Sequence, residues 1–358
     1  MDVRIEGDEL IFGRDGMRVG FQRTLRIPDD GKRYPLPAGF GLFPLRRVED
    51  YATRVPPSWR AHGGIFLPMY QREAMWLRFR GDRGTPRAVK VGVGKICAVT
   101  GLPWMDALRE HPQDYLVTPP QPWLDGICVG VGEIRQFVAM PLGLGYTVEG
   151  QVTGEERHGG LQISVFEPHR RFRGRTWRPF TEPDGVDAYP GEIAPTSTAG
   201  FDFPQACLMR SPRSRSTRSP IMESASVGEM GLAAGGRMKQ KLYPDPLGID
   251  AWQSIPSGRV FVHLVNSEAW RDITGEAPPE TPITAKSYRR AGLPWFELYD
   301  ETAGTASPQP ILAAVKSTAT LDAEHSDRPL VDDEAIEPRP LRWLGWRSRK
   351  GRISGGIW

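Results

Sequence analysis

Residues 134–166 read IRQFVAMPLGLGYTVEGQVTGEERHGGLQISVF and hold the strongest strand signal in the chain. Apolar and polar residues alternate through 146–153 and again through 161–166. The apolar members are Tyr146, Val148, Val152, Leu161, Ile163 and Val165. A period of two with one apolar face is typical of an antiparallel sheet that packs on one side. The intervening GEERHGG, too long for a tight turn, fits a hairpin loop.

This pattern predicts a β-rich α+β protein with short helices and long ordered loops. Its mainly antiparallel sheet should include residues 134–140, 146–153 and 161–167. Glycine (40) and proline (34) make up about a fifth of the 358 residues, which also favours short elements separated by turns.

Composition and patterning divide the chain into five parts. They are N-terminal strands and a Pro/Gly-rich arm (1–60), an antiparallel β core (61–167), a long Arg-rich loop excursion (168–222), an α/β continuation of the core (223–300), and a weakly patterned, basic, Trp-rich C-terminal tail (301–358). Further elements are expected within these parts. They are strand runs in 1–27 and 65–99, helices starting at 103 and 223 (the latter broken at Gly235-Gly236), a strand at 259–265, a capped helix at 266–275 and a short helix at 310–317.

Pro-Trp occurs three times, each time followed by an apolar residue and an acid, at Pro103-Trp104, Pro122-Trp123 and Pro294-Trp295. Proline suits the first position of a helix, and an acid suits its first turn. We therefore interpret the repeat as a reused helix start with a buried tryptophan. The alternative is an exposed tryptophan platform for a sugar or another flat ligand.

Composition and charge favour an ordinary soluble protein. The net charge of +3 does not by itself imply a polyanionic partner. The three cysteines, Cys97, Cys128 and Cys207, have motif-free spacings, so we expect free thiols, a reducing compartment and a cytoplasmic location. No apolar run is long enough for a transmembrane helix, and no secretion signal is recognised, so no membrane partner is expected.

The familiar catalytic and cofactor motifs fail. Gly94-Lys95 lacks the other residues of a phosphate-binding loop, and the chain has no HExxH, GxSxG or EF-hand pattern. No cofactor and no metal site is expected. The best carboxylate group for acid–base hydrolysis is the set Glu149, Glu155, Glu156 and His158, although wet loop carboxylates are the more common case.

A second candidate site is the basic and aromatic stretch HRRFRGRTWR at 169–178. Phosphate neutralisation by arginine and stacking by aromatic rings are what single-stranded nucleic acid binding requires. The residues predicted to bind an anionic ligand or nucleic acid are Arg170, Arg171, Phe172, Arg173, Arg175, Trp177 and Arg178. A solvated loop is the alternative.

Three classes of function therefore compete. The first is a non-catalytic, homo-oligomeric binding or structural protein, favoured by the arm at 28–60 and by the tail, which carry aromatic and arginine residues typical of interfaces. The second is a hydrolase with a site assembled from distant carboxylates. The third is a single-stranded nucleic acid binding protein. The first has the best support, and its principal partner is a second copy of the chain.

Overall fold

The computed structural model describes residues 3–13, 16–81, 84–173, 228–279, 295–296, 309–325 and 352–356. Its strands in chain order are β1 (Val3–Glu6), β2 (Glu9–Phe12), β3 (Met17–Thr24), β4 (Arg33–Tyr34), β5 (Leu36–Pro37), β6 (Gly39–Leu42), β7 (Arg46–Arg47), β8 (Ile65–Met69), β9 (Ala74–Arg80), β10 (Arg87–Val93), β11 (Ile96–Cys97), β12 (Leu116–Thr118), β13 (Trp123–Leu124), β14 (Gly126–Gly130), β15 (Glu133–Pro141), β16 (Leu161–Phe166), β17 (Glu229–Lys239), β18 (Gly258–Asn266) and β19 (Trp295–Phe296).

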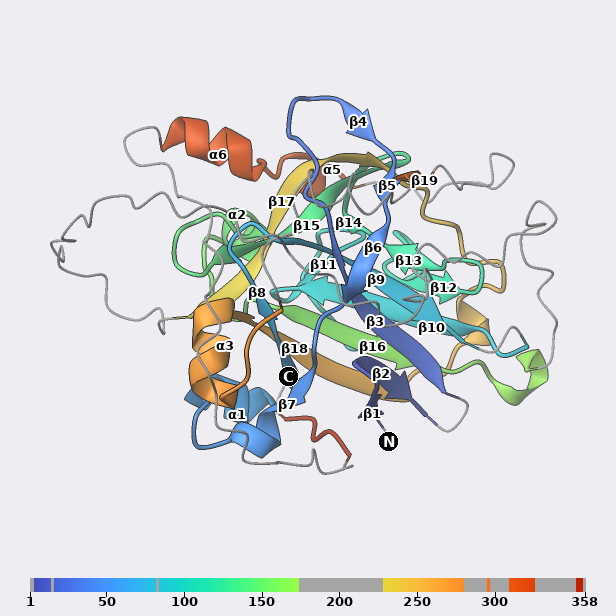
Figure 1. Cartoon of the computed structure of the whole chain (residues 1–358). Helices are drawn as coiled ribbons and strands as arrows, with labels where there is room; N and C mark the ends of the chain where they lie inside the picture. The colour runs from blue at the N-terminus through green and yellow to red at the C-terminus, as the bar shows by residue number, and fades with distance from the viewer. Residues whose placement is uncertain are drawn as a thin grey trace, which may run out of the picture.

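Helices are short and lie at the edges of the sheet (Figure 1). They are α1 (Pro57–His62), α2 (Val148–Thr153), α3 (Ser267–Thr274), α5 (Pro310–Ala313) and α6 (Thr318–Glu324), with 3₁₀ turns η1 (Val48–Tyr51), η2 (Arg170–Phe172) and η3 (Ile249–Ala251). The predicted strand-rich fold with a large antiparallel sheet and short helices is confirmed in the described residues.

The large sheet has two halves that meet where β17 pairs with the end of β18. In the first half the order is β12, β10, β16, β18, β8, β7, and in the second it is β17, β15, β9, β3, β2, β1. Most pairs are antiparallel, while β8 runs parallel to β18 and β4 runs parallel to β17. The predicted strands at 134–140, 161–167 and 259–265 are confirmed as β15, β16 and β18.

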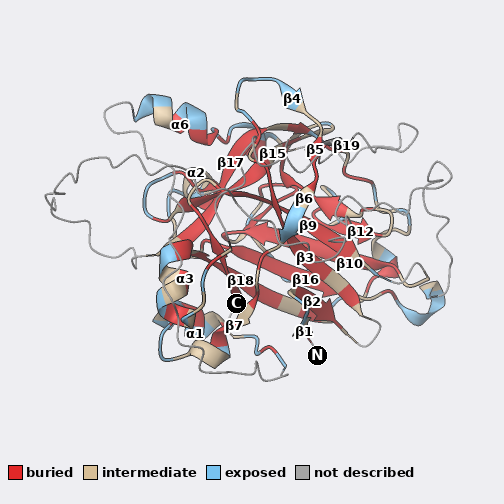
Figure 2. Ribbon diagram, viewed as in Figure 1, coloured by how far each residue is buried: buried red, intermediate tan, exposed pale blue. Residues whose placement is uncertain are grey.

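Both halves contribute to one apolar core. Val91, Ile163 and Val262 from the first half belong to the same buried cluster as Leu77 and Phe137 from the second. Each such side chain contributes roughly 1.5–3 kcal/mol when it is fully buried. The strands are accordingly almost wholly buried, and exposed residues concentrate in the helices and loops (Figure 2).

The arm at 28–60 forms no long regular element, as expected, but it packs on its own chain. Leu36 and Phe43 are fully buried and Leu45 is nearly so, whereas Phe40 keeps 40% of its surface exposed. Short strands β4 to β7 join the arm to the sheets by main-chain pairing.

The prediction of a strand at 146–153 is wrong, because α2 occupies residues 148–153. The Thr147 side chain caps it by accepting a hydrogen bond from the Gly150 N–H, and Gly154 ends it with a φ of 80°. Val148 and Val152 are four residues apart, so their spacing fits one face of a helix as well as alternate positions of a strand.

The interpretation of Pro-Trp as a helix start is also wrong. Trp123 lies in β13 and Trp295 in β19, and no helix begins at Pro103. Pro103 instead makes a bridge to Ile96, and the Trp104 N–H donates to the Lys95 carbonyl. These tertiary contacts override the local preference of proline and acid for a helix start.

The helix expected from 223 is replaced, over its described residues, by the long strand β17. Gly235-Gly236 does not end a helix there. It permits close packing, since a Cβ on Gly236 would lie 2.4 Å from the Pro28 carbonyl oxygen, and one on Gly235 would lie 2.6 Å from Val138. The capped helix after β18 is confirmed, with Asn266 accepting from the Glu268 N–H and Gly275 in the left-handed region.

Cys97 and Cys128 are buried free thiols, as expected, and Cys207 lies outside the described residues. No helix in the described part of the chain is long and apolar enough to cross a membrane. The cytoplasmic location stays a prediction.

Candidate functional site

The outer face of the first half-sheet carries a strip of polar side chains between two apolar clusters. The pairing registers place Lys90, Ser164 and Arg259 in one row across β10, β16 and β18. The next row holds Gly92, Gln162 and Phe261. The apolar cluster at one end of the strip includes Tyr115, Phe166 and Trp252, and the cluster at the other end includes Trp59, Phe66 and Trp270.

A loop that begins at Pro103 covers part of this strip. The Trp104 ring lies against Gly92, where a Cβ atom would be only 2.6 Å from the ring. The Lys90 Nζ lies 5.3 Å from the centre of the same ring, within cation–π range. The Trp104 Nε1 donates to the Asp106 carboxylate at 3.1 Å. The bare backbone of Gly92 therefore positions Trp104, and Trp104 helps to position Asp106.

Lys90, which lies in the sheet, fixes the covering loop to it. Its Nζ donates to the Asp114 carboxylate at 2.7 Å and to the Ala107 carbonyl at 2.6 Å, and the side chain is 1% exposed. Removing one partner of a buried pair leaves an uncompensated charge. The covering loop is thus held by a charged contact that also fixes the position of Ala107.

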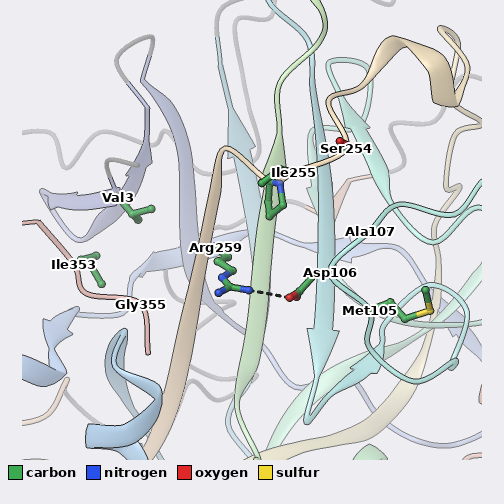
Figure 3. A pocket seen from close by; sticks show the side chains of 10 residues that line it. Val3, Met105, Asp106, Ala107, Ser254, Ile255, Arg259, Ile353 and Gly355 are labelled. Carbon is green, nitrogen blue, oxygen red and sulfur yellow. Dashed lines mark hydrogen bonds and ion pairs between the residues drawn. The ribbon is translucent and has the colours of Figure 1, made fainter. Parts of the chain in front are cut away.

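Beside the loop lies a groove with a volume of about 720 Å³ (Figure 3). Its walls come from four separate parts of the chain, including both ends. The lining residues are Val3, Met105, Asp106, Ala107, Ser254, Ile255, Pro256, Arg259, Ile353 and Gly355. Figure 3 shows the Arg259 guanidinium and the Asp106 carboxylate pointing toward each other. The Arg259 Nη1 donates to the Asp106 carboxylate at 2.8 Å.

The groove combines an apolar rim with a charged pair. Ile255 is 75% exposed and Met105 is 48% exposed, which is high for large apolar side chains. On the same face of the sheet, the Ser164 hydroxyl and the Gln162 side-chain nitrogen are buried and have no hydrogen-bond partner in the described residues. Buried polar atoms are usually paired, so these two are exceptions; both residues lie outside the groove lining, and the Gln162 oxygen accepts from the Lys95 N–H at 2.8 Å.

The residues at 352–356 form one wall of the groove. The Ile353 N–H donates to the Val3 carbonyl at 2.9 Å, and the Ser354 carbonyl accepts from the Gly64 N–H at 3.0 Å. The Gly356 N–H donates to the His62 carbonyl at 2.8 Å, and Gly355 makes an antiparallel bridge with Gly63. The two ends of the chain thus meet in this wall.

Behind that wall lies a stack of rings. The His263 ring lies 4.7 Å from the Trp59 ring and 4.9 Å from the Phe261 ring, and His62 stacks on Phe261 at 4.6 Å and lies 6.2 Å from His263. Burial lowers the pKa of His263 to about 3, and burial together with the nearby charge of Lys95 lowers the pKa of His158 to about 4. The His263 Nε2 lies 3.0 Å from the Gly63 carbonyl oxygen, so the neutral ring donates there.

Of the four residues predicted to be catalytic, Glu149 and His158 come together, but they lie outside the groove lining. The Glu149 carboxylate accepts from the backbone N–H groups of His158 and Gly159, at 3.1 and 2.9 Å. Burial raises the pKa of Glu149 to about 7 against the lowering effect of these hydrogen bonds.

The other two predicted acids have different surroundings. Glu156 accepts from the N–H groups of Gly143, Gly145 and Thr147 and from the Thr147 hydroxyl, so it fastens the loop before α2. Glu155 is exposed and pairs with Arg157 at 2.6 Å. A catalytic role for this set stays a prediction.

The predicted nucleic acid loop is described only in part. Arg170 and Phe172 bound the turn η2, the Arg171 guanidinium lies 5.0 Å from the Phe172 ring, and Arg173 pairs with Glu167 at 2.6 Å. Arg175, Trp177 and Arg178 lie outside the described residues. Nucleic acid binding by this loop also stays a prediction.

Sequence reasoning missed the groove, although one signal for it was present. The alternation in RVFVHLV places Val260, Val262 and Leu264 in the core, and therefore places Arg259, Phe261 and His263 together on the opposite face. A strand whose second face mixes a cation with aromatic rings is not a simple solvated face. No cluster of histidine, cysteine or carboxylate side chains suited to a metal ion occurs in the described part of the chain.

Comparisons with protein-family models, with curated proteins and with solved structures found no match to this chain. The functional argument therefore rests on the geometry of the groove and of its walls.

Proposed function

We propose that this protein is a homo-oligomeric binding protein that acts without catalysis, and that the groove beside Arg259 is its binding site. The observation that supports the proposal is the groove itself. Its volume of about 720 Å³ lies within the range of roughly 300–1,000 Å³ that is usual for ligand pockets. Its apolar rim and its few polar groups match the usual lining of such pockets.

The charged groups in the groove favour binding over hydrolysis. Acid–base hydrolysis of the kind considered above requires two positioned proton-transfer groups. Among the described residues that line the groove, Asp106 is the one carboxylate, and it accepts from Arg259 and from Trp104. A carboxylate held in this way serves to position Arg259.

The lining also favours one class of ligand. Ile255, Pro256 and Met105 offer contact to an apolar body, while Arg259 offers hydrogen bonds to an anionic group. The ligand we propose is therefore an amphipathic anion. Arg259 would exchange its contact with Asp106 for contacts with the charged group of this ligand.

Binding of the fluorescent amphipathic anion 1-anilinonaphthalene-8-sulfonate tests this site. We expect saturable binding to the full chain and at least ten-fold weaker binding to Ile255→Asp, because a carboxylate on the rim repels the sulfonate and removes apolar contact. Val131→Asp is the matched control, since Val131 is also well exposed, at 67%, but lies outside the groove lining. No saturable binding, or equal weakening by both substitutions, would exclude the groove as the binding site.

A hydrolase remains the second candidate, and the raised pKa of Glu149 is the observation that favours it. A buried carboxyl with a pKa of about 7 is suited to proton transfer near neutral pH. Hydrolysis of 4-nitrophenyl acetate and of 4-nitrophenyl glycosides tests it. A rate above background that Glu149→Gln abolishes and exposed Glu155→Gln preserves would support the hydrolase and contradict the binding protein.

A further inference from the structure

The residues at 352–356 occupy a slot in the rest of the protein, which we call the tail slot. It is formed by Val3, by Arg47 and by residues 61–64. The Arg47 guanidinium donates to the Arg352 carbonyl at 3.1 Å, and main-chain hydrogen bonds hold Ile353, Ser354 and Gly356. Ile353 is the one described tail side chain that is buried, at 8% exposure.

Recognition in the tail slot is that of an added β-strand. Contacts through the main chain give affinity in such sites, and a few side-chain positions give specificity. Here the specificity is for glycine. A Cβ on Gly356 would lie 1.9 Å from the Ala61 carbonyl oxygen, and a Cβ on Gly63 would lie 2.6 Å from the Ser354 carbonyl oxygen.

We propose that the tail slot takes the C-terminal segment 352–356 of a second copy of this chain, and that this exchange builds the homo-oligomer. The partner then contributes Ile353 and Gly355 to the wall of the groove, so each binding site is complete only in the assembly. This inference rests on the proposed binding function, and the partner it adds is a second copy of the chain.

The length of the connection permits the exchange. Residues 326–351 separate the end of the α6 region from Arg352, and 26 residues can span up to about 90 Å when extended. A segment on so long a connection can reach a neighbouring slot.

The character of the contacts also permits it. The hydrogen bonds at Arg352, Ile353, Ser354 and Gly356 described above use main-chain atoms of the tail, and the same bonds form whichever copy supplies the segment. Exchange of an identical element between copies is a low-cost route to a symmetric dimer.

Two glycines of the tail provide a matched test. Gly356→Ala introduces the 1.9 Å clash described above, whereas a Cβ on Gly355 has no atom within 4 Å. Neither glycine has a positive φ, so alanine brings no backbone strain at either position. We expect light scattering at about 50 μM to find an oligomer for the natural chain and for Gly355→Ala. For Gly356→Ala we expect at least a ten-fold rise in the dissociation constant of the oligomer.

A peptide competition makes the test independent of the stability of the variants. Excess peptide Arg-Ile-Ser-Gly-Gly, with the sequence of residues 352–356, should dissociate the natural oligomer. The peptide with alanine in place of its last glycine should not. A monomeric natural chain, or an oligomer that ignores both the substitution and the peptide, would overturn the exchange.

Failure of the exchange can be told from failure of the binding function. If the natural chain is monomeric and still binds 1-anilinonaphthalene-8-sulfonate in an Ile255-dependent manner, the exchange is refuted and the binding site stands. If the chain forms a tail-dependent oligomer without binding that anion, the exchange stands and the proposed ligand class is refuted.

Discussion

His263 provides a quantitative test of the packing behind the groove wall, through the substitution His263→Phe. The ring is 2% exposed, stacks on Trp59 and Phe261, and donates from Nε2 to the Gly63 carbonyl at 3.0 Å. Phenylalanine keeps the stacked ring and removes both the hydrogen bond and the titration. Loss of the hydrogen bond lowers the stability at every pH, whereas loss of the titration raises it at low pH, so the net effect on stability changes with pH.

The magnitudes follow from the pKa of the ring. Burial lowers the pKa of His263 from an ordinary 6.5 to about 3, so the unfolded chain binds the proton first as the pH falls. The stability contributed by the neutral ring is complete above pH 6.5 and is lost progressively below it. With about 1.4 kcal/mol for each pKa unit, the natural chain loses about 1.4 kcal/mol by pH 5.5 and about 2.7 kcal/mol by pH 4.5.

The substitution leaves the Gly63 carbonyl without its donor, which costs about 1–2 kcal/mol at every pH. We therefore expect His263→Phe to be less stable than the natural chain at pH 7, equal to it near pH 5.5 and more stable by about 1 kcal/mol at pH 4.5. Urea unfolding followed by tryptophan fluorescence measures the difference, in which the other titrating groups cancel. A difference that is constant from pH 7 to pH 4.5 would refute the reasoning.

Three further substitutions test the charged groups of the interior. Because burial raises the pKa of Glu149 to about 7, the free energy of unfolding of the natural chain should fall between pH 4.5 and pH 7, by about 2 kcal/mol after allowance for solvent screening. Urea unfolding of Glu149→Gln should show no such fall. Burial holds the pKa of Asp125 well above its ordinary value, so thermal unfolding at pH 8 should find Asp125→Asn at least as stable as the natural chain. At pH 4 the variant should have no such advantage in stability. A large loss of stability at both pH values would contradict a neutral Asp125. Lys90→Met should cost about 3–5 kcal/mol in urea unfolding by leaving the Asp114 charge unpaired, and Asp114→Asn in the same chain should restore part of it.

Strands with one apolar face were predictable because their signal is local. In β16 and β18 every second residue enters the core, and the structure confirms both. The same local signal failed at 146–153, where Val148 and Val152 satisfy two periods and the cap at Thr147 decides for the helix. It failed again at Pro103, because the Trp104 ring packs against Gly92 in β10, and periodicity does not report a contact between a loop and a strand.

The candidate groove could not be predicted from local patterns. Its walls join Val3 to Ile353, and they place Arg259 of β18 opposite Asp106 of the covering loop. Contacts at such separations depend on the order of strands in the sheet, which alternation does not specify. The two glycine pairs at 63–64 and 355–356 look like ordinary turns in the sequence. The structure shows that they pack against each other, with no room for a Cβ atom at Gly63 or Gly356.

The polar strip itself argues that this face serves more than folding. Apolar clusters flank it on both sides, and Trp104 already covers its middle, so apolar side chains in place of Ser164 and of the whole Lys90–Asp114 pair would pack there without a buried charge. Replacing a buried ion pair by apolar groups of similar size is often neutral or stabilising. Departures from the most stable solution are expected at functional sites. Here the departure lies on the face of the sheet that carries the groove, and this coincidence is the reason to look for the ligand there rather than at Glu149.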